Sequence, residues 1–268
     1  MTFSFHRLPV GIDNCFLLRG ERTILIDGGA QGSFKAFQRG LNRLGVDPQE
    51  IALIILTHGH WDHIGSLHPI QQATGAKVAV HYRDQSWVES GRPEFPRGVT
   101  RYGKSMSWLA ERLIHPKLPP VKVDIVLGDE GLSLAEYGIP GQVIYTPGHS
   151  PGHVSIVLDS GEAFVGDMAM NAWFLRLTPG LPVLADDINQ VVASWHKIIS
   201  QVKQARIPAV FLENVSDPRL IQRIAAETGA KLGGTLYSDG LTGEKGDAPT
   251  YIDMVRHNIK ALTQALAN

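Results

Sequence analysis

The sequence predicts an α/β protein, in which layers of helices and strands pack around a hydrophobic core. Three observations support this class. Helical and strand patterns alternate along the chain. One strand pattern, IALIIL at residues 51–56, is continuously apolar, which is typical of a strand buried on both faces. Apolar residues make up 43% of the 268 residues, enough for one large domain or a domain with an appendage.

In the first third of the chain, short β-rich runs bounded by glycine predict strands, and apolar residues at helical spacing predict helices. We expect strands over residues 15–20, 22–29, 51–56 and 77–81, and helices over 33–45 and beginning near Ile64 or Gly65. The strand over 51–56 leads directly into THGHWDHIG at 57–65. That motif should therefore lie at the end of a buried strand.

The pattern loosens between residues 84 and 120. Two helical pieces, 85–90 and 104–114, are separated by GRPEFPRG. A segment of this kind is more often a surface cap than core, so we interpret 84–120 as a cap. Beyond it we expect strands over 123–128, 142–148, 154–161 and 162–167, then a helix over 193–204. The remaining residues predict a strand, helix, strand and helix in succession, over 209–213, 217–230, 231–238 and 250–267.

The composition argues against several partners and environments. The formal net charge is −1, so no strong field attracts nucleic acid or an anionic membrane. Cys15 is the single cysteine, which excludes an internal disulfide framework and a cysteine-rich zinc site. The stretch MTFSFHRLPVGIDNC lacks the pattern of a secretory signal, and no apolar run is long enough to span a bilayer. We therefore expect a cytoplasmic protein.

Residues 57–65 carry four metal-binding side chains in close succession: His58, His60, Asp62 and His63. Imidazole and carboxylate together suit Zn²⁺, Fe²⁺ or Mn²⁺. The alternative is a cluster of ordinary polar loop residues, but the spacing HxHxDH at the end of an apolar strand is a specific signal for metal. TPGHSPGH at 146–153 and FVGDM at 164–168 follow later predicted strands and add two further candidate ligands.

Together, in this order, the three motifs resemble the metallo-β-lactamase superfamily over roughly residues 3–200. That resemblance implies an αββα sandwich with a metal site at one edge. It assigns a first metal ion to His58, His60 and His149, a second to Asp62 and His63, and a bridging role to Asp167. Asp27 in IDGG resembles the carboxylate that orients a ligand histidine, although a plain turn aspartate is an equal alternative. His153 would support the ligands or face the substrate.

Such a site implies hydrolysis by a metal-activated hydroxide, with Asp62 orienting the water or taking its proton. The substrate class that we favour is a small ester, thioester or lactone, with one or two Zn²⁺ ions as cofactor and Fe²⁺ or Mn²⁺ as alternatives. Two other functions stay open. His58, His149 and Asp167 could form the triad of a mononuclear iron oxygenase. The chain could also be a metal-binding protein whose catalysis is compromised.

The superfamily normally adds one more histidine after a late strand, and this chain lacks that motif. From about residue 201, the segments AVFLENVSDPRL, GGTLYSDGL and APTYIDMVRHN resemble instead the C-terminal lobe of zinc and manganese ABC-transporter receptors. This resemblance predicts a junction between domains 1–200 and 201–268. In that resemblance Glu213 and Asp239 match metal ligands. We expect Glu213 to replace the missing histidine at a weaker second site; its alternative is to cap a helix or face solvent. Apolar surface on the tail allows a homodimer as one outcome.

Overall fold

The computed structural model describes residues 3–11, 13–113, 117–170, 180–204, 209–213, 222, 225–226, 231–237, 242 and 246–266. The chain divides into two compact units. Unit 1 comprises Met1–Met170 and Leu181–Ile198, and unit 2 comprises Asn171–Gly180 and Ile199–Asn268. Each unit is described by itself.

Unit 1 contains a six-stranded sheet in the order β1-β2-β3-β4-β5-β6. Its strands are β1 (Ser4–Val10), β2 (Asp13–Arg19), β3 (Thr23–Ile26), β4 (Ile51–Ile55), β5 (Lys77–His81) and β6 (Ile125–Leu127). The first three pair antiparallel, and β3 to β6 pair in parallel. The sequence did not predict β1, whose alternate exposed positions dilute its apolar pattern. Parallel pairing brings the ends of β3, β4 and β5 to one edge.

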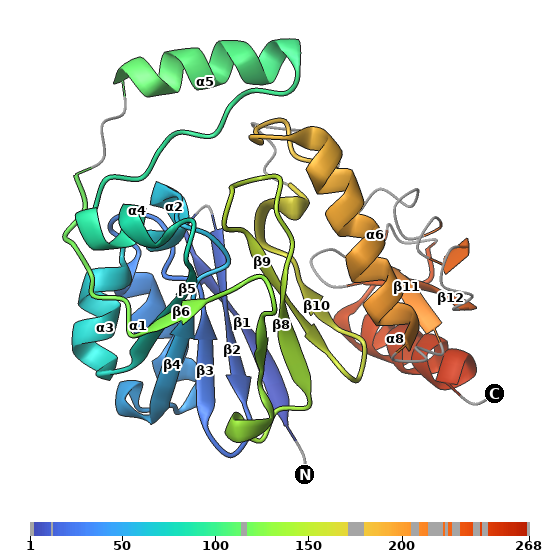
Figure 1. The fold of residues 1–268 in the computed structure, drawn as a ribbon. Coiled ribbons are helices and arrows are strands. Elements are labelled where there is room, and N and C mark those ends of the chain that lie inside the picture. The colour runs from blue at the N-terminus through green and yellow to red at the C-terminus, as the bar shows by residue number, and fades with distance from the viewer. Residues whose placement is uncertain are drawn as a thin grey trace. The chain divides into compact units, whose positions relative to one another are not determined.

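Helices cover one face of this sheet (Figure 1). They include α1 (Phe34–Leu44), the short α2 (Trp61–Ile64), α3 (Leu67–Thr74) and α4 (Gln85–Ser90). A 3₁₀ turn at Pro48–Glu50 precedes β4. Phe37 of α1 and Ile70 of α3 pack in one buried cluster with Leu25 and Ile54. Gly45 ends α1 in the left-handed conformation, with φ 64°, as the glycine predicted.

The short helix α2 begins at Trp61, three or four residues before the predicted start near Ile64 or Gly65. The carbonyl of His63, near the end of this helix, accepts the N–H of Gly28 at 2.8 Å. The turn that carries Asp62 and His63 is therefore held by the strand beside it. Local helix propensity, which is all that the sequence pattern reports, does not include that contact.

The opposite face of the six-stranded sheet packs on a four-stranded antiparallel sheet in the order β10-β9-β8-β7. Its strands are β7 (Leu132–Ser133), β8 (Gly141–Tyr145), β9 (Val154–Leu158) and β10 (Ala163–Phe164). Leu53 and Ile24 from the first sheet share a buried cluster with Ile156 from the second. The helix α6 (Ile188–Gln204) is tied to the turn after β10 by Trp195, whose Nε1–H donates to the carbonyl of Met168 at 2.9 Å. The predicted layered α/β fold is confirmed.

In unit 2, β11 (Ala209–Glu213) pairs in parallel with β12 (Lys231–Leu236). The helix α8 (Tyr251–Leu266) is joined to the end of β12 by Asn258, whose side chain accepts from the N–H of Tyr237 at 3.0 Å and donates to its carbonyl at 2.8 Å. The helix predicted over 217–230 lies almost wholly outside the described residues. No helix within the described part of the chain is long and apolar enough to cross a membrane.

Candidate metal centre

The ligands predicted in unit 1 follow β4, β8 and β10, in loops, in the short helix α2 and in a 3₁₀ turn. The loop after β4 carries His58 and His60, and the loop after β8 carries His149; one nitrogen from each of these rings lies within 4.8 Å of the other two. Nδ1 of His60 lies 2.9 Å from Nε2 of His149. All three side chains are buried. Three imidazoles from two loops thus converge on one point.

A second group of potential ligands, formed by His58, His63 and Asp167, shares one residue with the first. Asp167 lies in the 3₁₀ turn after β10, with Oδ1 3.3 Å from Nε2 of His63 and Oδ2 3.5 Å from Nε2 of His149. Its carboxylate therefore lies between a ring of the first group and a ring of the second. The side chains of Asp13, Asp62 and His63 form a third group within the same 4.8 Å limit.

The hydrogen bonding of these side chains is incomplete. Among the residues that the structure describes, four buried side-chain atoms have no hydrogen-bond partner: Oδ2 of Asp13 and Nε2 of His58, His63 and His153. A buried polar atom without a partner is costly, and here all four belong to one region. A divalent cation would satisfy such atoms, and the nitrogen and carboxylate donors suit Zn²⁺, Fe²⁺ or Mn²⁺. The residues present therefore fit a metal centre.

Asp27 occupies the turn after β3 and contacts His63 directly. Its Oδ2 lies 2.9 Å from Nδ1 of that ring. Its carboxylate also accepts the N–H of Thr57 at 2.8 Å and the hydroxyl of Thr57 at 2.9 Å. Asp27 has a positive φ of 64°, a conformation that aspartate tolerates better than most residues. These contacts fix the ring of His63 with Nε2 toward Asp167.

The electrostatic environment divides the histidines into two kinds. Burial lowers the pKa of His58, His60 and His153 well below the ordinary value, which favours the neutral imidazole that binds metal. Burial also opposes charge on His63, but Asp27 and Asp167 outweigh it and raise the pKa of that ring well above its usual range. For Asp167 the opposite holds: burial would raise its pKa, and His63 holds it well below the ordinary value.

Two acidic residues of this region have no counterpart in the motifs. Burial raises the pKa of Asp13 to about 7, although the charge of His63 opposes that change. Asp84 is buried and links two ligand loops: it accepts the N–H of Gly59 at 3.0 Å, the hydroxyl of Ser150 at 2.7 Å and the N–H of Gly152 at 2.7 Å. The only signal for Asp84 was its place shortly after β5, at the edge where β4 also ends.

Replacing Asp84 with alanine is expected to destabilise the protein and weaken metal binding. The change leaves the buried N–H groups of Gly59 and Gly152 without their acceptor, at about 1–3 kcal/mol each. Both ligand loops then lose a shared anchor, so we expect metal affinity to fall about 10–100-fold. Chemical unfolding and zinc titration measure the two effects. Asp159→Ala, in the exposed turn after β9, is the control, and equal values for both variants would contradict this role.

The predicted cap contacts the centre through a short stretch of chain. The N–H of Val99 donates to the carbonyl of Val183 at 3.0 Å. The N–H of Ala185 donates to the carbonyl of Arg97 at 2.7 Å. Between them, the carbonyl of Leu184 accepts from Nδ1 of His149 at 2.9 Å. The cap residues before α5 (Arg101–Leu113) thus support a candidate ligand through one neighbouring segment.

The predicted cap carries three large aromatic residues in its helices α4 and α5. Trp87 of α4 is buried and stacks on the ring of His60, with centroids 5.6 Å apart and planes at 18°. Tyr102 and Trp108 of α5 are more than half exposed, at 52% and 57%. Only Trp87, of these three, therefore lies against a candidate ligand in the described structure.

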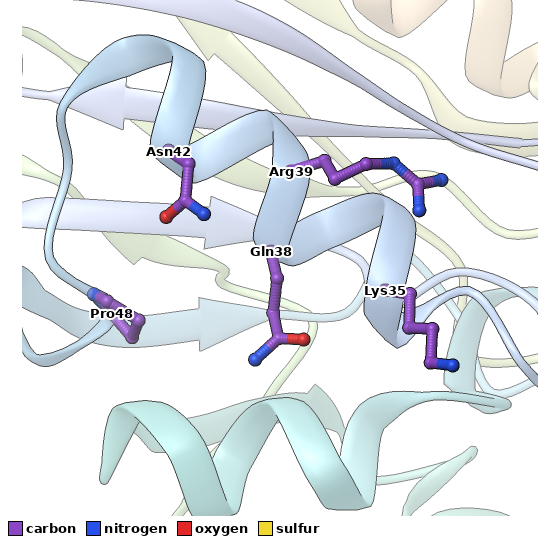
Figure 2. A pocket seen from close by; sticks show the side chains of 5 residues that line it. All are labelled: Lys35, Gln38, Arg39, Asn42 and Pro48. Carbon is purple, nitrogen blue, oxygen red and sulfur yellow. The ribbon is translucent and has the colours of Figure 1, made fainter.

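The ligands predicted in the tail stay predictions. Glu213 is the last residue of β11, in unit 2, and its side chain lies outside the described structure. Asp239 lies outside the described residues altogether. A surface hollow elsewhere, lined by residues of α1 and by Pro48, contains none of the candidate ligands: Figure 2 shows Lys35, Gln38, Arg39 and Asn42 along the helix.

Two family models match the chain, and they confirm both resemblances. Residues 8–211 match the Metallo-beta-lactamase superfamily. Residues 184–265 match the zinc-uptake complex component A, periplasmic. A curated relative of the tail, the iron-binding protein YfeA of Yersinia pestis, is 36% identical over 67 residues, which cover 25% of this chain and 22% of that protein.

The larger part of the chain is similar to curated hydrolases. The probable metallo-hydrolase YflN of Bacillus subtilis is 30% identical over 174 residues, which cover 62% of this chain and 63% of that protein. The hydroxyacylglutathione hydrolase GloC of Haemophilus influenzae is 25% identical over 158 residues, which cover 58% of this chain and 66% of the relative. This chain thus spans less than two thirds of each of these relatives.

Among solved structures, the B3 metallo-beta-lactamase BLEG-1 superposes with a TM-score of 0.54 at 25% identity, covering 74% of this chain and 87% of that one. The FEZ-1 metallo-beta-lactamase of Legionella gormanii has a TM-score of 0.51 at 20% identity, covering 77% and 74%. The second likeness concerns the fold alone.

Proposed function

Because the chain belongs to the metallo-beta-lactamase superfamily, we propose that it is a metal-dependent hydrolase of a small ester, thioester or lactone. The observation that carries the proposal is the set of buried donor atoms without hydrogen-bond partners, to which His58 and His63 each contribute Nε2. They lie among the six side chains that the motifs predicted as ligands. Burying such atoms without partners costs folding free energy, and a bound cation would remove that cost.

We assign one ion to His58, His60 and His149, a second to Asp62 and His63, and the position between them to Asp167. Nitrogen-rich donors favour Zn²⁺ for the first position, while the carboxylates of the second also suit Mn²⁺ or Fe²⁺. When bound, such ions supply Lewis acidity and lower the pKa of a coordinated water toward neutrality.

The residues of the chain position the reactants and move the proton. Burial raises the pKa of Asp62. We assign to this carboxylate the role of general base, which accepts the proton of the attacking water. The water oxygen bonds to the carbonyl carbon, the bond from that carbon to the leaving oxygen or sulfur breaks, and the proton leaves with the alcohol or thiol. Asp27 keeps the ring of His63 in one orientation, and Asp84 holds the loops after β4 and β8 at a fixed spacing.

An acyl thioester is the substrate that we favour within this class. Relatives named hydroxyacylglutathione hydrolase support it, because an acylglutathione is a thioester of a small acyl group. The formal net charge of −1 provides no overall electrostatic attraction for polyanionic substrates. Burial of the candidate ligands also favours a substrate small enough to present a single carbonyl group at the centre.

Turnover by the full chain is expected to require metal. We would treat the protein with a chelator, confirm metal loss by elemental analysis, and assay an acylglutathione thioester, an aryl ester, a lactone, a β-lactam and a phosphodiester before and after adding zinc. We expect hydrolysis of the thioester or ester that disappears on chelation and returns with zinc. Tight metal binding without turnover of any substrate would contradict the proposal, as would oxygen consumption with an iron-loaded protein and a thiol.

A further inference from the structure

We propose that Asp13 is a ligand of the second metal ion, together with Asp62 and His63. No motif pointed to this residue, and the inference rests on the proposed two-ion centre. One carboxylate oxygen from Asp13, one from Asp62 and one ring nitrogen from His63 lie within 4.8 Å of one another. Three donors at that spacing form an open coordination site that leaves further positions for water or substrate.

The sheet topology explains why Asp13 reaches this site. Strand β2 runs antiparallel to β3, while β3 and β4 run parallel. The start of β2 therefore lies at the edge where β3 and β4 end, which is the edge that carries the ligand loops. Asp13 is the first residue of β2, directly after the β1–β2 turn, in which Gly11 has a φ of 93°.

The side chains of this group have the donor atoms that a cation requires. Oδ2 of Asp13 is buried, and it has no hydrogen-bond partner among the described residues. His63 is only 5% exposed, and Asp27 holds its Nδ1 at 2.9 Å. Its Nε2 makes no hydrogen bond and lies 3.3 Å from Oδ1 of Asp167, the carboxylate assigned between the two ions. Two carboxylates close together in buried surroundings repel each other, and a divalent cation between them removes that repulsion.

Asp13 and Glu213 are rival candidates for the same role. The sequence suggested Glu213 because a strand-end carboxylate could replace a missing histidine. Asp13 lies in unit 1, with a carboxylate oxygen within 4.8 Å of the donor atoms of Asp62 and His63. The side chain of Glu213 lies outside the described structure. One carboxylate in place of a neutral imidazole adds Asp13 to the two negative ligands already assigned to the second ion, Asp62 and the shared Asp167. Such a set favours a harder ion such as Mn²⁺ more than a histidine-rich set does.

The test is a metal titration of the full chain after chelation. We would measure bound zinc per chain by elemental analysis, and follow Co²⁺ binding by its visible absorption, for the wild type, Asp13→Asn and Glu213→Gln. In the wild type we expect two equivalents. In Asp13→Asn we expect the first equivalent to bind with unchanged affinity and spectrum, and the second to weaken at least tenfold. An unchanged first equivalent also establishes that the variant is folded.

Three results would overturn the inference: a second equivalent in Asp13→Asn within twofold of wild-type affinity, a loss that affects both equivalents alike, or a wild type that binds one ion. The Glu213→Gln variant should retain both equivalents. The proposed function is tested separately, because turnover assays measure it and the metal titration does not. A wild type that hydrolyses nothing while Asp13→Asn loses the second ion would refute the hydrolase and support the ligand assignment.

Discussion

Replacing Asp62 with asparagine is expected to lower kcat for the favoured thioester by about 10²–10⁴-fold, the usual range for loss of a general base. The amide keeps the shape and one oxygen of the carboxylate but cannot accept a proton from water. The ring donors of His58, His60 and His149 are untouched, so at least one metal ion should remain bound. Steady-state kinetics on protein of known metal content measure both quantities.

The matched control for this variant is Asp159→Asn, which makes the same chemical change in an exposed turn. Its kcat should equal that of the wild type. Two outcomes would contradict the assignment of Asp62. The first is a kcat within tenfold of the wild type at equal metal content. The second is loss of all bound metal, since that would identify Asp62 as a support of the whole centre and not as a base beside it.

Most of the candidate site could be predicted because its residues are adjacent in the chain. The motif at 57–65 places several donors within one turn after β4, and continuous apolarity identified that strand. His149 and Asp167 likewise follow β8 and β10 directly. Strand ends are set by local patterns. Parallel pairing brings the ends of β3, β4 and β5 to one edge, and β8 and β10 end on the same side of their sheet because both run antiparallel to β9. For such residues, knowing which strand they follow is nearly enough to predict where they lie in the fold.

Asp13 and Asp84 could not be found in this way. Each is a single aspartate with no distinctive neighbours, and each contacts residues far away in the chain: Asp13 reaches the group of His63, and Asp84 reaches Gly152. Their contribution depends on tertiary contacts that no periodicity reports.

The second large effect is expected for Asp27→Ala, in the stability of the metal-free protein. Removal of this carboxylate leaves the N–H of Thr57 and the charged ring of His63 without their buried partner. Removing one member of a buried ion pair costs about 3–5 kcal/mol of unfolding free energy. Alanine in the left-handed conformation of residue 27 adds about 1–2 kcal/mol. Denaturant unfolding in the presence of chelator measures the sum.

Asp27→Asn separates the charge of this residue from its shape. Asparagine tolerates the left-handed conformation and can still accept from Thr57, so its cost should be smaller than that of alanine. The remaining cost should depend on pH. Because Asp27 helps to raise the pKa of His63, the pair stabilises the folded protein below about pH 6.5, the unfolded value, and that stability is lost as the pH rises through the folded pKa.

The difference in unfolding free energy between the wild type and Asp27→Asn should therefore be largest below about pH 6.5 and shrink as the pH rises through the raised pKa of His63. A difference that does not change with pH would show that Asp27 acts on Thr57 alone. The same two proteins titrated with zinc at pH 7.5 report the other role of this contact. If Asp27 fixes the ring of His63, the asparagine variant should bind the second ion about 10–100-fold more weakly and the first ion unchanged.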